Sequence, residues 1–301
     1  MSKTNWQTVI GLEIHVELLT KHKIFCSCPN RFGDLPNTIK CPICEGLPGA
    51  IPKLNEEVLE LATKAGLILN CEINEKSTFD RKNYFYPDLP KGYQITQFYN
   101  PLCRNGYIDL PSGSRIRISD IHMEDDAAKI IREDSNINVD YNRCGVPLIE
   151  IVTMPDFKNS EEVVEFLEIL RRDFQYAGIS DCRIEQGSMR ADVNLSVMRD
   201  GESLGVRTET KNMASFKAIA KAIENGGGDS IVKTILSPVI EIAAALAIGA
   251  VFGVILKFLT VWFTGRGNRL ALTYAFVFAC IGLGNMFGLS SLLECMALGA
   301  A

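Results

Sequence analysis

The chain has 301 residues, enough for one large domain or two smaller ones. Its net charge of −5 argues against a general nucleic-acid coat, although a local basic patch could still bind phosphates. The charge is unevenly spread, because residues 225–301 carry only four basic and three acidic side chains. We therefore expect a charged, soluble N-terminal part and a hydrophobic C-terminal part.

Residues 8–18 alternate in polarity and are rich in β-branched side chains, which predicts a strand. Glu13, His15 and Glu17 would share one face of it, because alternate residues of a strand point to the same side. A solvated edge face is the alternative interpretation. No export signal precedes this strand, so the ten cysteines are expected to be thiols or metal ligands.

Two close pairs of cysteines, Cys26 with Cys28 and Cys41 with Cys44, flank a loop-like segment. Each pair can span one edge of a tetrahedron, so the spacing favours a zinc site. Four thiolates leave no open position on the metal, which indicates a structural zinc knuckle over residues 26–44. The alternatives are four unrelated buried thiols, or a redox pair at Cys41 and Cys44 that leaves the first pair unexplained.

A packing helix is predicted over 56–69, with Asn55 as its cap, and a loop over 79–97. The loop mixes cations with aromatic rings, and such a loop can neutralise phosphate and stack a base. An ordinary surface loop with aromatic side chains in the core explains the composition equally well. The cations and rings that could do so are Arg81, Lys82, Tyr84, Lys91 and Tyr93.

Further carboxylates occur among apolar neighbours beyond a hairpin predicted over 100–119. Glu124 lies in an acidic cluster, and Glu150 lies in a short strand over 148–152. A carboxylate in an apolar strand is costly unless it meets a cation or a metal. We therefore predict that three strands bring together one acidic site for a hard cation, built from Glu13, His15, Glu124 and Glu150.

The next elements complete an α+β pattern. A helix is predicted over 161–176, with Ser160 as its cap, and it is followed by a strand over 184–199 that has Arg190 on its polar face. A second strand near 208–212 and a helix over 215–224 come after them. A sheet with charged residues along one face and helices behind it is typical of an active-site platform.

Several strings in this part resemble the B subunits of the aspartyl/glutamyl-tRNA amidotransferases, the GatB family. The resemblance covers residues 5 to about 224, and its motifs are long enough to be specific. Its zinc-bearing members have cysteine pairs at positions similar to those found here. The matching strings are IGLEIHVE at 10–17, FDRKNYFYPD at 79–88, HMEDD at 122–126, DYNRCGVPLIE at 140–150 and EQGSMR at 185–190.

The resemblance implies a cytoplasmic enzyme, a glutamine-dependent carbon–nitrogen ligase that acts on misacylated tRNA. ATP would phosphorylate the side-chain carboxylate of Glu on tRNA(Gln) or of Asp on tRNA(Asn). Ammonia would come from glutamine, released by the amidase GatA of a heterotrimer that also contains the small protein GatC, and would then displace the phosphate. The implied cofactors are ATP, Mg²⁺ and a structural Zn²⁺.

The resemblance also implies a fold and a set of site residues. Residues 1–224 would form an incomplete, glutamine-synthetase-like cradle built on an antiparallel sheet. Within it, Glu13, His15, Glu124 and Glu150 would be the catalytic Mg²⁺-site residues, and Arg190 together with residues 79–94 would contact nucleotide or acyl-tRNA.

The character of the chain changes after residue 224. Residues 225–229 are a Gly-rich joint, and residues 242–256 and 270–293 are uncharged, so we expect two hydrophobic, membrane-type helices. Residues 230–301 resemble a fragment of a cation/proton antiporter, which implies membrane association through 238–293 and a membrane location if this tail is genuine. We interpret the chain as a chimera of two unrelated parts.

Two other functions are open on the sequence alone. A membrane transport protein with a fused soluble domain requires a complete helical bundle with intramembrane ionisable residues, and two helices with Glu241 and Lys257 fall short of that. A zinc-knuckle binding module explains the cysteines but leaves the four predicted cation-site residues without a role.

Overall fold

The computed structural model describes residues 6–133, 136–199, 205–211, 213, 215–226, 231–262, 265–287 and 291–300. The chain divides into two compact units, Met1–Gly227 and Gly228–Ala301. Each unit has its own fold, and the candidate sites all lie in the first.

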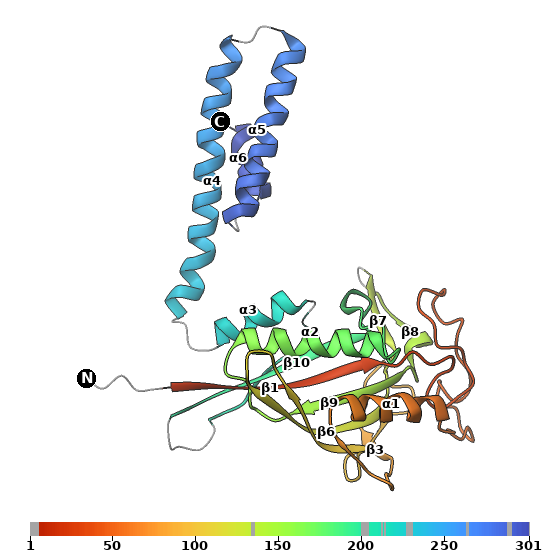
Figure 1. Ribbon diagram of the computed structural model, residues 1–301. Helices are drawn as coiled ribbons and strands as arrows, with labels where there is room; N and C mark the ends of the chain where they lie inside the picture. The colour runs from red at the N-terminus through yellow and green to blue at the C-terminus, as the bar shows by residue number, and fades with distance from the viewer. Residues whose placement is uncertain are drawn as a thin grey trace. The chain divides into compact units, whose positions relative to one another are not determined.

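The first unit is built on a seven-stranded antiparallel sheet with the strand order β11-β10-β1-β9-β6-β5-β2 (Figure 1). From Leu12 on, the even-numbered residues of β1 are buried, and Glu13, His15 and Glu17 between them are partly exposed, so the sheet has one apolar and one polar face. This confirms an α+β fold with a large antiparallel sheet. The strands are β1 (Trp6–Glu17), β2 (Glu72–Ile73), β5 (Cys103–Asp109), β6 (Arg115–Asp125), β9 (Pro147–Thr153), β10 (Met189–Arg199) and β11 (Thr208–Thr210).

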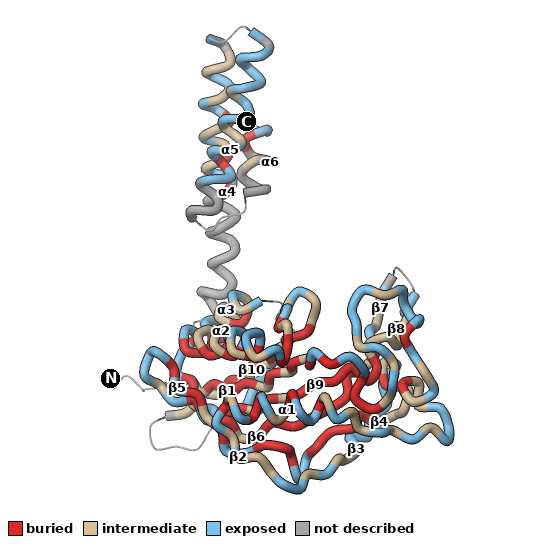
Figure 2. Tube along the Cα trace, turned by 45° about the vertical axis from the view of Figure 1, so that its right-hand side comes forward, coloured by how far each residue is buried: buried red, intermediate tan, exposed pale blue. Residues whose placement is uncertain are grey.

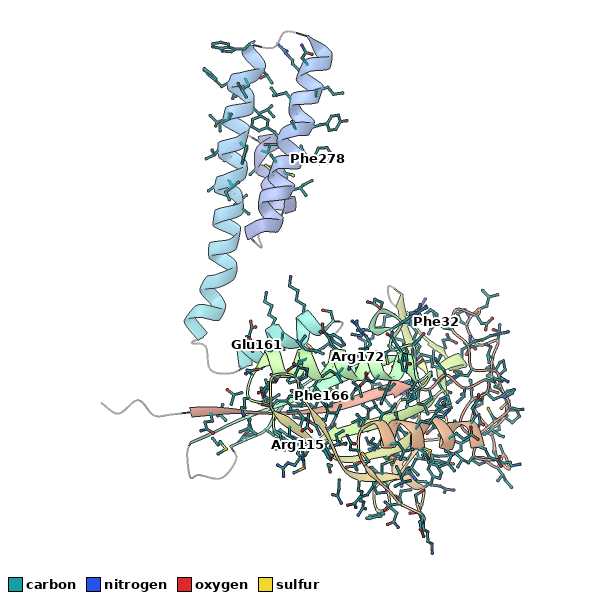
Figure 3. The ribbon with its side chains drawn as sticks, in the orientation of Figure 1. Phe32, Arg115, Glu161, Phe166, Arg172 and Phe278 are labelled. Carbon is teal, nitrogen blue, oxygen red and sulfur yellow. The ribbon has the colours of Figure 1, made fainter. Side chains whose placement is uncertain are left out.

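Three helices, α1 (Glu56–Ile68), α2 (Ser160–Tyr176) and α3 (Phe216–Gly226), contribute apolar side chains to the same core as the sheet (Figure 2). Phe166 points from α2 toward the sheet and makes an edge-to-face contact with Phe157, with ring centroids 5.3 Å apart (Figure 3). The helices thus cover the apolar face and leave the polar face for chemistry.

The helix caps were predicted with mixed success. Asn55 caps α1 as expected, because its side chain accepts a hydrogen bond from the amide of Glu57 at 3.1 Å. The cap of α2 is Asn159 rather than Ser160, which is already the first helical residue. Asn159 accepts from the amide of Glu162 at 2.9 Å, and both side chains are cap formers, so the pattern alone did not separate them.

Two hairpins lie outside the main sheet: β3 (Asp80–Asn83) with β4 (Tyr93–Thr96), and β7 (Lys129–Glu133) with β8 (Asn136–Asp140). The first hairpin corrects the prediction of a loop over 79–97. The strand predicted from residue 184 begins only at Met189, because Ile184–Gln186 form a 3-10 turn that ends at Gly187, with φ of 78°.

The second unit contains α4 (Ile231–Trp262), α5 (Arg266–Phe287) and α6 (Ser291–Ala300), with contacts between each pair. None of the helices, over the residues described, combines the length and apolarity that a membrane span requires. The predicted membrane-type helices, and membrane association through 238–293, are therefore not confirmed. Of the joint predicted at 225–229, the first two residues end α3, and 227–229 lie outside the described residues.

Candidate functional site

The register of three central strands brings polar residues together on one face of the sheet. His15 of β1 lies directly opposite Glu150 of β9, and His122 of β6 lies opposite the same glutamate from the other side. Directly opposed residues in an antiparallel pair point to the same face with their side chains in reach. Glu150 therefore lies at the centre of a row that crosses β1, β9 and β6.

His15, Glu124 and Glu150 converge within this row. The Nε2 atom of His15 is 3.3 Å from Oε1 of Glu124 and 3.4 Å from Oε2 of Glu150. One ligand atom from each of the three lies within 4.8 Å of the other two, a separation that one metal ion could bridge. Two carboxylates with one imidazole fit a divalent cation that keeps waters or phosphates in its shell.

The pKa values of the two carboxylates in this cluster shift in opposite directions from their ordinary values. Burial raises the pKa of Glu124 to about 7, and the nearby His15 opposes that shift. Burial would also raise the pKa of Glu150, but hydrogen bonds from His122 and His15 hold it well below its ordinary value. Glu150 is thus the stable anion of the group, and a cation bound beside Glu124 would favour the charged form of both.

His122 and Asp120 extend the cluster and were absent from the predicted site. The Nδ1 atom of His122 is 2.9 Å from Oδ1 of Asp120, and its Nε2 is 3.2 Å from Oε2 of Glu150. Burial lowers the pKa of His122, but the two carboxylates outweigh burial and raise it to about 10. The signal was present in the sequence, since residues 120, 122 and 124 alternate and must share one face of β6.

Glu13, the fourth predicted member, lies outside the cluster. It shares the polar face of β1, but its Oε1 accepts a hydrogen bond from Nδ2 of Asn194 at 2.9 Å, and Arg207 lies 3.8 Å away. Its direct neighbour on β10 is Asp192 rather than a residue of the cluster. Three of the four predicted residues therefore meet, and Glu13 flanks them.

A second charged network lies beside the cluster. Asp126 is paired with two arginines: it contacts Arg143, and Nη2 of Arg190 is 3.0 Å from its Oδ1. Arg143 also donates to Oε1 of Glu17 at 2.5 Å. Burial would raise the pKa of Asp126, but Arg190 and Arg143 lower it below its ordinary value. Both arginines line an open cleft of about 770 Å³ that is also lined by Glu17, Asp126 and further carboxylates, so the cleft combines both signs of charge.

The segment predicted as a loop that contacts nucleotide or acyl-tRNA, which contains the β3–β4 hairpin, has two kinds of cation. Lys91 is nearly buried, and its Nζ is 2.5 Å from Oδ2 of Asp125, so its charge is paired inside the protein. Arg81 and Lys82 are exposed, and they lie over the rings of Tyr93 and Tyr84, at 4.8 Å and 5.9 Å from the ring centroids.

The four knuckle cysteines come together as free thiols. The sulfur of Cys44 is 3.4 Å from that of Cys26, 3.7 Å from Cys41 and 3.8 Å from Cys28. Zinc–sulfur bonds of about 2.3 Å give a tetrahedron with edges of about 3.8 Å, so the thiols fit zinc without a large rearrangement. The Cys26 hydrogen bond and the charge of Lys23 lower the pKa of Cys44 to about 5 against the effect of burial.

Comparison with known proteins gives two separate matches. Residues 8–229 match the family described as the GatB/GatE catalytic domain, and residues 212–301 match the transmembrane sodium/hydrogen exchanger family. The B subunit of the aspartyl/glutamyl-tRNA(Asn/Gln) amidotransferase of Agathobacter rectalis is 56% identical over 227 residues, which cover 73% of this chain and 48% of that protein.

Two further proteins of the same name agree with that match. The one from Ruminiclostridium cellulolyticum is 57% identical over 221 residues, covering 71% of this chain and 46% of that protein. The one from Symbiobacterium thermophilum is 54% identical over 235 residues, covering 74% of this chain and 48% of that protein. The chain thus spans about half the length of the curated relatives it matches.

Proposed function

The chain belongs to the GatB/GatE catalytic domain family, and on that premise we propose that its first unit amidates misacylated tRNA. The proposed substrates are Glu attached to tRNA(Gln) and Asp attached to tRNA(Asn), with ATP as the phosphoryl donor. A side-chain carboxylate is a poor electrophile, so its phosphorylation to an acyl phosphate would precede the attack of ammonia. A partner amidase, GatA, would release that ammonia from glutamine, in a cytoplasmic assembly with the small protein GatC.

The observation that carries this proposal is the meeting of His15, Glu124 and Glu150 on the polar face of the sheet. These three residues would hold Mg²⁺, and Glu13 would act beside them through its hydrogen bond with Asn194. When bound, Mg²⁺ supplies charge neutralisation for the phosphates of ATP.

The residues around the cluster would orient it and bind the anionic substrate. Asp120 fixes the ring of His122, and His122 in turn holds Glu150, an arrangement typical of the outer partners of metal ligands. We assign Arg190, at the cleft, and the exposed Arg81 and Lys82, on the hairpin, to contacts with nucleotide or acyl-tRNA. Tyr84 and Tyr93 would contribute stacking surfaces, whereas Lys91 would support the hairpin through Asp125.

A binding experiment tests the cation site. Mn²⁺ would be titrated into the full chain with ATP present, and free Mn²⁺ followed by its electron paramagnetic resonance signal. We expect Glu124→Gln and Glu150→Gln each to weaken binding about 10–100-fold, as loss of a ligand or its support does. Glu168→Gln, on the exposed side of α2, is the control and should bind as the wild type does. Equal binding by all four proteins would contradict the site.

A separate experiment tests the reaction. The full chain, with Mg²⁺ and ATP, should release ADP when Glu-tRNA(Gln) is added, and should not when Gln-tRNA(Gln) is added, because only the first carries a side-chain carboxylate. ADP release that ignores the attached amino acid would refute the proposed substrate.

We propose further that the chain is an artificial fusion of two unrelated sequences, joined near residue 228. The two family matches meet in this region, where they overlap over residues 212–229, and the boundary between the compact units falls between Gly227 and Gly228. Sequencing the genomic DNA and the transcript across codons 224–230 tests this. A source genome that reads continuously through the junction would contradict an artificial fusion.

A further inference from the structure

Lys23 is a buried cation at the zinc knuckle. Its side chain is fully buried, with 0% exposed, and its Nζ donates to the carbonyl oxygen of Ile39 at 2.9 Å and to the sulfur of Cys44 at 3.6 Å. Across the residues that the structure describes, no ion pair joins this ammonium to an Asp or Glu carboxylate. A charge buried in this way needs a negative partner, because desolvation of an unpaired ammonium is strongly unfavourable.

Cys44 is the sulfur best placed to supply that negative charge. It is buried, and it is the thiol from which the other three knuckle sulfurs lie 3.4–3.8 Å away. Four thiolates around one Zn²⁺ leave an excess of two negative charges, and of the four cysteines Cys44, the one beside Lys23, is buried whereas the other three are partly exposed. An ammonium held against the central sulfur offsets part of that excess, and the thiolates offset the cost of burying the ammonium.

Lys23 is also held in place by the surrounding backbone. Its amide donates to the carbonyl oxygen of Cys28 at 3.0 Å, and the next amide, from Ile24, donates to the carbonyl oxygen of Gly145 at 2.9 Å. A Cβ at Gly145 would lie 3.7 Å from Cδ of Lys23, so the aliphatic stem packs against this glycine. The ammonium is therefore presented to the sulfur by a fixed segment rather than by a mobile surface side chain.

We propose that Lys23 is the counter-charge of the zinc site, a positioning residue whose buried ammonium, held against the sulfur of Cys44, offsets part of the excess negative charge of the four ligands. This inference rests on the proposed zinc site. Outer partners of metal ligands change metal affinity about 10–100-fold when they are removed. Lys23 acts on the metal through the charge of Cys44 and is not itself a ligand.

Lys23→Met, made in the full chain, removes the charge and keeps a side chain of similar length. Zinc affinity would be measured at pH 7 by competition with a chromophoric chelator, and the thiolate-to-metal charge-transfer bands of the Co²⁺-loaded protein would report the number of thiolates bound. We expect about 10–100-fold weaker zinc binding. The control is Lys40→Met: Lys40 is adjacent to Cys41, but its ammonium contacts Glu45, and we expect its zinc affinity to match that of the wild type.

A labelling experiment on the wild type covers the case in which Lys23→Met does not fold. Reductive methylation followed by mass spectrometry should modify Lys40 in both states, and Lys23 only after the zinc is removed by chelation. Wild-type protein that binds no zinc would overturn the zinc site and this inference with it. Wild-type protein that binds zinc, with Lys23→Met equal to it in affinity or with Lys23 equally unreactive after chelation, would overturn the role of Lys23 alone.

Discussion

Replacement of Lys91 by Met separates a structural role for this lysine from a role in substrate binding. The ammonium lies 2.5 Å from Oδ2 of Asp125, and the two side chains are only 9% and 2% exposed. Asp125 also accepts from the amide of Ile95 at 2.8 Å, so the carboxylate cannot turn to solvent without breaking the β4 contact. Loss of one partner from a buried ion pair costs about 3–5 kcal/mol, and we expect Lys91→Met to lower the free energy of unfolding by that amount.

The measurement is urea unfolding of the first unit, followed by tryptophan fluorescence. The chain has two tryptophans, Trp6 in β1 and Trp262 in α4, so a Trp262→Phe background makes the signal specific to the first unit. We expect the double variant Lys91→Met/Asp125→Asn to lose about 0.5–3 kcal/mol less free energy of unfolding than the two single variants lose together. The reason is that the double variant leaves no unpaired charge buried, whereas each single variant leaves one.

An exposed ion pair provides the control for this cycle. Arg172→Met removes the partner of Asp173 on the outer side of α2, and the midpoint should not change. A cost below about 1 kcal/mol for Lys91→Met, together with no coupling to Asp125, would refute the argument and return Lys91 to the set of free cations at the hairpin.

Three further predictions follow from single contacts. Gly46→Ala should destabilise the first unit by about 1–3 kcal/mol in the same urea assay, because φ is +67° there and a Cβ would lie 2.6 Å from Cγ of Lys91; an unchanged midpoint would contradict this. His122→Gln should weaken Mn²⁺ binding about 10–100-fold, read from the same titration, and affinity equal to the wild type would argue against its supporting role. The hydrogen bond from Arg117 lowers the pKa of Asp156 below its ordinary value of 3.8 in the folded protein. The stability that this ion pair contributes is therefore present above pH 3.8 and is lost as the pH falls through the pKa of the folded state. The urea midpoint of Asp156→Asn should fall less steeply in acid than that of the wild type, and parallel curves would contradict the linkage.

The knuckle and the strand β1 could be predicted because both signals are local. Paired cysteines at short spacing leave few geometries, and the four sulfurs do converge. Alternation over residues 8–18 defines a strand and its polar face without reference to any other element. The hairpin β3–β4 gave no such signal, because β3 has the sequence DRKN and three of its four residues are exposed. Without an apolar face, a strand is not distinguished from a loop by its pattern.

The position of Glu13 outside the cluster has a different cause. Alternation shows which face a side chain takes, but not which residue of the next strand lies opposite it. Glu13 and His15 are two residues apart, about 6.6 Å along the strand, so only one of them can lie across from Glu150. That choice depends on register between strands separated by more than a hundred residues, and register is set by the packing of the whole sheet.

The same register explains why Glu150 is the centre of the site. β9 lies between β1 and β6, so Glu150 has His15 on one side and His122 on the other. His15 is also on an interior strand, but its neighbour on the far side is Arg190 of β10, which is not a member of the cluster. Glu150 consequently contacts both His15 and His122, and the other ring nitrogen of His122 contacts Asp120. A carboxylate held by two imidazoles stays charged in a buried place, and a charged carboxylate beside Glu124 is what a hard cation requires. The affinity of the cluster for a divalent cation should therefore depend on the position of β9 between β1 and β6 as much as on the identity of any one ligand.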